Sequence, residues 1–203
     1  MNKWLVLMLL ADAPSIPAGD RLVDATTVVP SLQLDLRYAT PDNFLHRAVY
    51  PEGSRCLLLK DSADKLAVAT KALEPKGFRL SVFDCFRPRS VQYEMWKILP
   101  KPGYVADPRS GSNHNKGGAV DLTMVQLDGG VVEMPTPFDT FSKAAHHGYQ
   151  GGTTVSRRNR ETLREAMEGA GFKRNPMEWW HYDVPNAGKL PLLEASLVAD
   201  AGS

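Results

Sequence analysis

The sequence has almost no net charge and contains no hydrophobic run long enough to span a membrane. Its 24 Lys and Arg residues nearly balance its 23 Asp and Glu residues, which excludes the broad basic surface typical of nucleic-acid-binding proteins. The longest apolar run near the start, Trp4–Leu10, falls far short of the roughly 20 residues that a membrane-spanning helix needs. The composition predicts a small-molecule partner, no nucleic acid and no stable membrane insertion.

Internal repeats and low-complexity tracts are also missing, which excludes solenoids and disordered repeat proteins. With 203 residues, 43% of them hydrophobic, the chain can build one domain with a real core. We therefore expect a single catalytic domain over residues 19–203. Nothing in the pattern specifies an oligomeric state.

The first 18 residues have the layout of a secretory signal peptide. Lys3 precedes the apolar run Trp4–Leu10, and small residues follow, with candidate cleavage positions near Ala13 and Ala18. This layout predicts a periplasmic or secreted protein. The alternative is that Trp4–Leu10 is the first buried element of a cytoplasmic protein.

Cysteine is scarce, and the two cysteines, Cys56 and Cys85, leave two interpretations open. In an oxidising compartment they suit one disulfide bond. They could equally be two buried free thiols that pack as small apolar residues. A zinc site built from the cysteines alone is disfavoured, because the C-x-x-C spacing is absent.

Hydrophobic periodicity predicts an α+β fold in which helices pack on an antiparallel sheet. The predicted helices are mixed with hairpin-linked strands, and no strand-helix-strand unit repeats, which argues against a parallel sheet. The predicted strands are Leu32–Tyr38, Phe78–Phe83, Ala119–Leu127 and a hairpin return at Val131–Met134; the predicted helices are Asp61–Leu73, Arg87–Leu99 and Arg157–Gly169.

A polar, glycine-rich loop carries the first candidate metal ligands, His114 and Asp121. An imidazole and a carboxylate are both zinc ligand types. Seven residues of straight helix would separate them by about 10.5 Å along the axis, too far to share one ion. The glycine pair Gly117-Gly118 instead favours a turn followed by a strand. Alone, each residue could simply be a hydrogen-bonded loop residue.

The second cluster is Glu178-Trp179-Trp180-His181, an acid and a histidine enclosed by aromatic residues. Pro176 and Pro185 leave room for only a short helix, and on a flat strand residues three apart face opposite sides. We therefore expect a bulge or tight bend between Glu178 and His181, so that both side chains reach one site. The alternative is an aromatic core patch in which Glu178 pairs with an arginine.

These motifs together resemble the zinc D-alanyl-D-alanine dipeptidases, a family that includes vancomycin-resistance dipeptidases and is related more distantly to D,D-carboxypeptidases and the hedgehog signalling domain. The resemblance covers nearly the whole predicted mature chain. It rests on the segments D-L-R-Y-A-T at 35–40, D-C-F-R-P at 84–88, S-x-H-x-x-x-G-x-x-D at 112–121, F-D at 138–139 and E-W-W-H at 178–181. Cys85 departs from the family, which usually has a small residue there.

The resemblance implies one zinc ion per chain, bound by His114, Asp121 and His181. It also implies that Glu178 is the catalytic acid and base, and that Arg87 stabilises the charge that develops on the carbonyl oxygen. Tyr38, Asp139 and Ser112 correspond to positions near the substrate. The implied reaction is hydrolysis of the D-amino-acid dipeptide D-Ala-D-Ala by an activated water molecule.

Several alternatives remain at this point. Arg87 could merely pair with an acid such as Asp84, and Asp139 could be an ordinary turn residue. The pair His146-His147 is expected to be structural and to lie in a loop near the surface. For the whole protein, the alternatives are a D,D- or L,D-carboxypeptidase or endopeptidase that acts on larger peptidoglycan peptides, and a zinc-bearing binding domain without catalytic activity.

Overall fold

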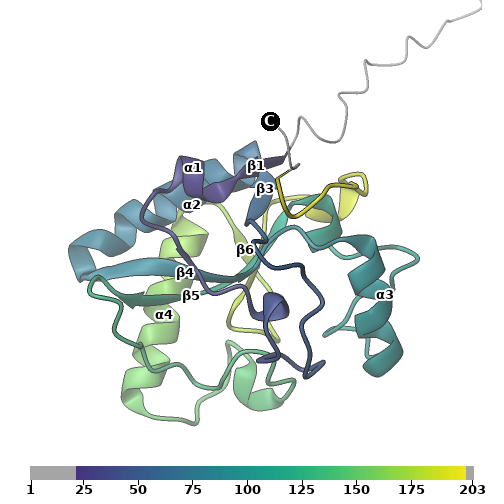
Figure 1. Ribbon diagram of the computed structural model, residues 1–203. Coiled ribbons are helices and arrows are strands. Elements are labelled where there is room, and N and C mark those ends of the chain that lie inside the picture. The colour runs from purple at the N-terminus through teal and green to yellow at the C-terminus, as the bar shows by residue number, and fades with distance from the viewer. Residues whose placement is uncertain (1–21, 200–203) are drawn as a thin grey trace, which may run out of the picture.

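The computed structural model describes residues 22–199, which form a mostly antiparallel sheet with two long helices on one face and a third to the side (Figure 1). Within this range the main sheet has five strands in the order β2-β4-β5-β7-β6. The α+β architecture predicted from the sequence is confirmed. The predicted leader, residues 1–18, lies outside the described residues. No helix in the described range is both long and apolar enough to cross a membrane.

No strand-helix unit repeats along the described part of the chain. The strands are β1 (Leu22–Asp24), β2 (Gln33–Leu34), β3 (Leu57–Leu59), β4 (Phe78–Asp84), β5 (Ala119–Gln126), β6 (Lys173–Arg174) and β7 (His181–Asp183). The α-helices are α1 (Ala25–Val28), α2 (Lys60–Leu73), α3 (Arg89–Ile98) and α4 (Thr154–Gly169). Short 3-10 turns η2 (Arg37–Ala39), η3 (Glu74–Lys76), η4 (His114–Lys116), η5 (Lys143–Ala145) and η6 (Ala187–Lys189) connect them.

Strand β5 shows how the sheet separates the core from the site. Side chains alternate between the two faces of a strand. Val120, Leu122 and Met124 belong to a hydrophobic cluster that also contains the buried residues of α2 and α4. Asp121 therefore points to the opposite face. A second hydrophobic cluster contains Val91 and Met95 of α3, which lies on the other side of the molecule in Figure 1.

The helices and long strands agree with the predicted ranges to within a few residues. The half-buried strand predicted at Leu32–Tyr38 is wrong in extent, because β2 has only two residues and the chain then turns into η2. Leu32 and Leu36 are buried whereas Leu34 is exposed, so the three leucines do not share one face. Strand β2 also pairs with β4 in parallel, whereas the other pairs are antiparallel.

The predicted hairpin return at Val131–Met134 is not a strand. A turn does follow β5, with the Gln126 amide donating to the Gly130 carbonyl at 2.9 Å. The backbone of Glu133 is then bound by helix α4, because the Asn159 side chain donates to its carbonyl at 2.9 Å. Pro135 and Pro137, which lack amide hydrogens, also limit pairing here.

Candidate active site

Three neighbouring strands place three polar side chains in one row. In the strand register Asp121 on β5 lies opposite His181 on β7 and opposite Asp84 on β4. All three residues lie on the face that is not covered by α2 and α4. The row joins segments that are far apart in the sequence, and the site is built around it.

His114 enters this row from the loop before β5. It lies in turn η4, which ends at Gly117 with φ of 66°, a left-handed conformation that glycine adopts without strain. Its Nε2 atom lies 3.2 Å from Nδ1 of His181 and 3.4 Å from Oδ2 of Asp121. The expected arrangement, a glycine turn followed by a strand, is confirmed.

His114, Asp121 and His181 form a candidate metal centre. One ligand atom from each lies within 4.8 Å of the other two, and the Asp121–His181 contact is 2.9 Å. His114 and Asp121 are buried and His181 is half-buried. Two imidazole nitrogens and a carboxylate match the ligand set of catalytic zinc sites, which leave a further position open. The residues present therefore fit a zinc ion.

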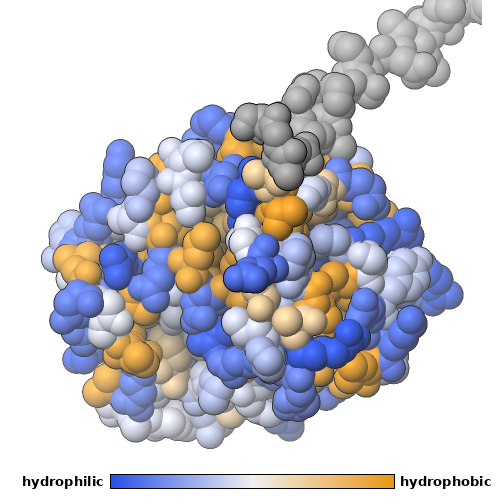
Figure 2. Space-filling model, in the orientation of Figure 1, coloured by the Kyte–Doolittle hydropathy of each residue, from blue (hydrophilic) through white to orange (hydrophobic). Residues whose placement is uncertain are grey.

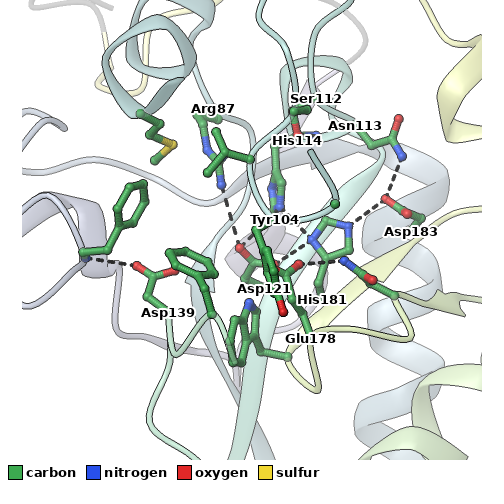
Figure 3. Close-up of a pocket in the computed structure, with 18 of the residues that line it drawn as sticks. Arg87, Tyr104, Ser112, Asn113, His114, Asp121, Asp139, Glu178, His181 and Asp183 are labelled. Atoms are coloured by element: carbon green, nitrogen blue, oxygen red, sulfur yellow. Dashed lines mark hydrogen bonds and ion pairs between the residues drawn. The ribbon is translucent and has the colours of Figure 1, made fainter. Parts of the chain in front are cut away.

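The outer atoms of both histidines are held by hydrogen bonds. Nδ1 of His114 lies 2.8 Å from the carbonyl oxygen of Cys85, so His114 presents Nε2 to the site. Nε2 of His181 lies 3.1 Å from Oδ1 of Asp183, so His181 presents Nδ1. Asn113 in turn donates to the same Asp183 oxygen at 3.0 Å (Figure 3). Such outer contacts fix the ring orientation of metal-binding histidines.

Neighbouring charges shift the pKa values of Asp121 and His181 in the direction opposite to that caused by burial. Burial alone would raise the pKa of Asp121, but His114 and His181 hold that pKa well below its usual range. Burial alone would lower the pKa of His181, but Asp183 and Asp121 raise it well above its usual value. Asp121 is thus an ionised carboxylate, the form that binds a cation.

Glu178 reaches the site through a tight bend. The Glu178 amide donates to the Asn175 carbonyl at 3.3 Å, and the His181 amide donates to the Glu178 carbonyl at 3.3 Å. These consecutive turns confirm the expected distortion. The Asn175 side chain donates to Oε2 of Glu178 at 2.7 Å. Burial, with a contribution from the Asp121 charge, raises the pKa of Glu178 to about 8.

Arg87 is buried between Asp84 and the cavity. Its Nε and one terminal nitrogen donate to Asp84 at 2.9 and 2.6 Å, and the other terminal nitrogen donates to Gln92 at 2.8 Å. The guanidinium also lies 3.8 Å from Asp121 and packs over the ring of Tyr38. Arg87 therefore pairs with Asp84 and also lines the cavity, so the two interpretations of this residue do not exclude each other.

The predicted substrate residues line the same cavity. The Tyr38 hydroxyl lies 3.1 Å from Oδ1 of Asp139, and the Phe44 amide donates to Oδ2 of Asp139 at 3.3 Å. Asp139 has φ of 58°, which is uncommon for a residue other than glycine. Burial, together with the Asp121 charge, raises its pKa to about 7. Ser112 is buried, and its hydroxyl accepts a hydrogen bond from the His114 amide at 3.2 Å.

The cavity has a volume of about 250 Å³ and is lined by all eight residues predicted from the sequence. All of them except Tyr38 are labelled in Figure 3. In this view Asp139 lies at one side of the group and Asp183 at the other. Aromatic side chains complete the wall: Phe44, Tyr104, Phe141 and Trp180. The cavity thus combines charged groups in its interior with an apolar, aromatic wall.

Sequence reasoning named Asp84 as an acid that could pair with Arg87, and the structure contains this pair. It missed four other residues that hold the site in place: Gln92, Asn113, Asn175 and Asp183. For Asp183 a signal existed, because a residue two positions after His181 on a strand lies on the same face. The others act through contacts that depend on the tertiary structure, and no spacing rule indicates them.

The expectation for the pair His146-His147 is wrong in one respect. His146 is half-buried, with its Nε2 3.2 Å from the Tyr104 hydroxyl, but His147 is buried rather than near the surface. Its ring packs against Tyr182, on the helix side of β7. Burial, with Arg174 and Arg160 nearby, lowers the pKa of His147 to about 4. His147 is therefore neutral, and neither histidine belongs to the candidate metal centre.

Comparison with known proteins gives consistent matches. A family model described as D-ala-D-ala dipeptidase matches residues 19–199. A D-alanyl-D-alanine dipeptidase of Escherichia coli is 37% identical over 85% of this chain and 89% of its own length. Proteins of the same name from Enterococcus faecium and Streptomyces coelicolor are 33% and 31% identical, and the matches cover 87% and 88% of their lengths.

Proposed function

Because the chain belongs to the D-ala-D-ala dipeptidase family of peptidases, we propose that it hydrolyses the free dipeptide D-Ala-D-Ala with one zinc ion bound by His114, Asp121 and His181. One observation carries the proposal. The three ligand atoms lie within 4.8 Å of one another in a cavity that also contains Glu178 and Arg87. A zinc ion bound there would polarise the peptide carbonyl and lower the pKa of a water molecule.

Glu178 is proposed as the general base and acid. The hydrogen bond from Asn175 fixes one of its carboxylate oxygens, and the other has no hydrogen-bond partner within residues 22–199, so that it can take the proton of the attacking water. Glu178 then delivers that proton to the departing amine. Its buried setting suits both steps, because burial raises the proton affinity of a carboxylate.

Arg87 is proposed to stabilise negative charge on the carbonyl oxygen. A guanidinium has five N–H donors, and three are occupied by Asp84 and Gln92. One N–H on each terminal nitrogen remains for the substrate. Two hydrogen bonds from Arg87 to Oδ2 of Asp84 hold the group in place before the reaction, which is the condition for effective electrostatic stabilisation.

Asp139 and Tyr38 are proposed to bind the ammonium group of the dipeptide, and Ser112 to contact the substrate near the metal. The cavity of about 250 Å³ lies below the roughly 300–1,000 Å³ of pockets for drug-sized ligands. This size favours a free dipeptide over the longer peptides that a carboxypeptidase or endopeptidase would accept. Glu178 and Arg87 argue against a zinc-bearing domain without activity.

We also propose that the protein acts outside the cytoplasm, in the periplasm or as a secreted enzyme. The leader-like residues 1–18 support this, and so does the disulfide between Cys56 and Cys85. Disulfides persist in oxidising compartments. Cell fractionation tests the proposal, and recovery of the uncleaved chain in the cytoplasm would contradict it.

The decisive experiment for the activity is an assay of the purified protein with D-Ala-D-Ala and, separately, with peptidoglycan peptides ending in D-Ala-D-Ala. We expect hydrolysis of the free dipeptide, loss of activity with a chelator and recovery with zinc. Cleavage of only the longer peptides would support the carboxypeptidase alternative. Stoichiometric zinc binding without hydrolysis of either substrate would support the binding domain.

A further inference from the structure

The Cys56–Cys85 disulfide lies directly behind the candidate metal centre. Cys85 follows the last residue of β4, and Cys56 precedes the first residue of β3. Both residues are buried, with 1% and 0% exposure. The bond therefore joins the end of β4 to the start of β3 inside the protein core.

Cys85 also provides a contact to the centre through its backbone. Its carbonyl oxygen accepts the hydrogen bond from Nδ1 of His114 at 2.8 Å. This bond keeps the proton on Nδ1 and directs Nε2 to the position where a metal would be bound. The orientation of His114 thus depends on where the Cys85 carbonyl is held.

The regular sheet does little to hold that carbonyl. The ladder between β4 and β5 is irregular between Val82 and Asp84, just before Cys85. After Cys85, the Phe86 amide donates to the Leu57 carbonyl at 2.8 Å, next to Cys56. The disulfide and this hydrogen bond together attach the segment after β4 to the start of β3.

The same strand, β3, also supports the loop that carries His114. The Leu59 amide donates to the carbonyl of Gly117, the residue that ends the His114 turn, at 3.0 Å. One short strand is thus connected both to the loop of His114 and, through the disulfide, to the acceptor of its ring proton. The position of the His114 loop relative to the Cys85 carbonyl decides the direction in which Nε2 of His114 points.

We propose that Cys56 and Cys85 are positioning residues of the metal centre: their disulfide holds the Cys85 carbonyl against His114 and so raises metal affinity. The inference rests on the proposed zinc site and adds a role for two residues outside it. Outer-shell partners of metal ligands typically contribute about 10–100-fold to metal affinity. Because the Cys85 carbonyl remains present without the disulfide, we expect a loss of metal affinity at the lower end of this range, about tenfold.

The test is the zinc dissociation constant, measured by competition with a chromophoric chelator at a temperature at which circular dichroism shows every variant folded. We compare the wild type with Cys56→Ala, Cys56→Ala/Cys85→Ala and Cys56→Val/Cys85→Ala. The last pair keeps more apolar volume in the core, so that a folded variant without the bond is obtained. Leu163→Ala is the matched control, because Leu163 is fully buried on α4, behind the opposite face of the sheet.

We expect all three cysteine variants to bind zinc about tenfold more weakly, by the same factor, while Leu163→Ala binds like the wild type. Cys56→Ala is the most specific test, because it removes the disulfide and keeps Cys85, now as a free thiol, with its carbonyl still present. Wild-type affinity in Cys56→Ala, or a loss equal to that in Leu163→Ala, would overturn the proposal. A wild-type protein that binds no zinc would instead contradict the proposed function.

Discussion

At the scale of single residues, the site depends on which ring nitrogen each histidine presents to the candidate metal centre. His114 presents Nε2 and His181 presents Nδ1, because a carbonyl and a carboxylate hold their other nitrogens. In the described part of the chain, Asp84 and Gln92 accept hydrogen bonds from Arg87, and the N–H groups that they do not occupy can bind substrate. The function proposed for each residue therefore follows from its outer partner.

Substitution of Arg87 tests its proposed role. We expect Arg87→Ala to lower kcat by about 10²–10³-fold, the loss typical of removing one oxyanion donor. Zinc content measured by atomic absorption should stay at the wild-type value, because Arg87 is not a ligand. Since Arg87→Ala leaves Asp84 buried and unpaired, Arg87→Lys serves as a second variant that keeps the charge. Wild-type turnover in both variants would remove Arg87 from the mechanism.

The pH dependence of substrate binding tests Asp139. Its pKa of about 7 means that the carboxylate loses its charge as the pH falls below 7, and a neutral carboxyl binds an ammonium group weakly. We expect KM for the free dipeptide to rise as the pH falls from 8 to 6. In Asp139→Asn, KM should be high and nearly independent of pH over that interval. The same pH dependence in Asp139→Asn and wild type would contradict the ammonium role.

At the scale of elements, the site depends on how strands end and loops turn. Strand β7 is only His181–Asp183, yet its register opposite β5 places His181 beside Asp121. Turn η4 then places His114 against both. The regular helices α2 and α4 take no part in the chemistry and instead cover the other face of the sheet.

Gly117 is the element-scale test. Its φ of 66° disfavours any side chain, and a Cβ atom there would lie 2.5 Å from Leu22 and 3.2 Å from the backbone nitrogen of Leu59. We expect Gly117→Ala to reduce stability by more than about 1 kcal/mol and to weaken zinc binding, because the His114 turn must shift.

The control for this variant is Gly171→Ala. Gly171 also has a left-handed backbone, with φ of 91°, but a Cβ atom there meets only the flexible Lys65 side chain. It lies after α4, away from the site. We expect urea unfolding to show a loss of stability in Gly171→Ala, with zinc affinity unchanged. Equal zinc affinity in both variants would show that the His114 turn tolerates a shift at Gly117.

At the scale of the whole molecule, the cavity lies between two hydrophobic clusters and is lined by residues of both. One lies between the sheet and the helices α2 and α4, and the other packs against the buried side of α3. The cavity is lined by Trp180 from the first cluster and by Tyr38 and Met95 from the second. On the face shown in Figure 2, hydrophobic side chains are scattered among hydrophilic ones.

The disulfide should contribute to global stability as well as to the site. Its sequence separation of 29 residues corresponds to about 3–4 kcal/mol from restriction of the unfolded chain. For a protein of this size we expect its loss in Cys56→Val/Cys85→Ala to lower Tm by roughly 7–15 °C. Thermal unfolding of the metal-free protein, followed by circular dichroism, measures this. An unchanged Tm would show that the bond does not stabilise the fold.

Much of the fold could be predicted because its signals are local. The helical spacing of Ala63, Leu66, Ala67, Ala69 and Leu73 predicts the apolar face of α2. The structure buries four of these residues and leaves Ala67 half-buried. The strand predicted at Leu32–Tyr38 was too long, because only Gln33–Leu34 forms a strand, and the return predicted at Val131–Met134 was wrong. In both segments local alternation does not reveal whether a neighbouring strand is available for pairing.

The sequence by itself determined the residue types of the site, the three long helices and two long strands of the fold, and the need for a turn before Asp121 and a bend before His181. These follow from side-chain chemistry, glycine and proline positions and hydrophobic period, all of which are local. Only the tertiary structure decided that Cys56 bonds to Cys85, that Arg87 both pairs with Asp84 and lines the cavity, and which nitrogen each histidine presents. The physical reason is that these contacts join segments far apart in the chain, and their geometry depends on strand register and loop closure.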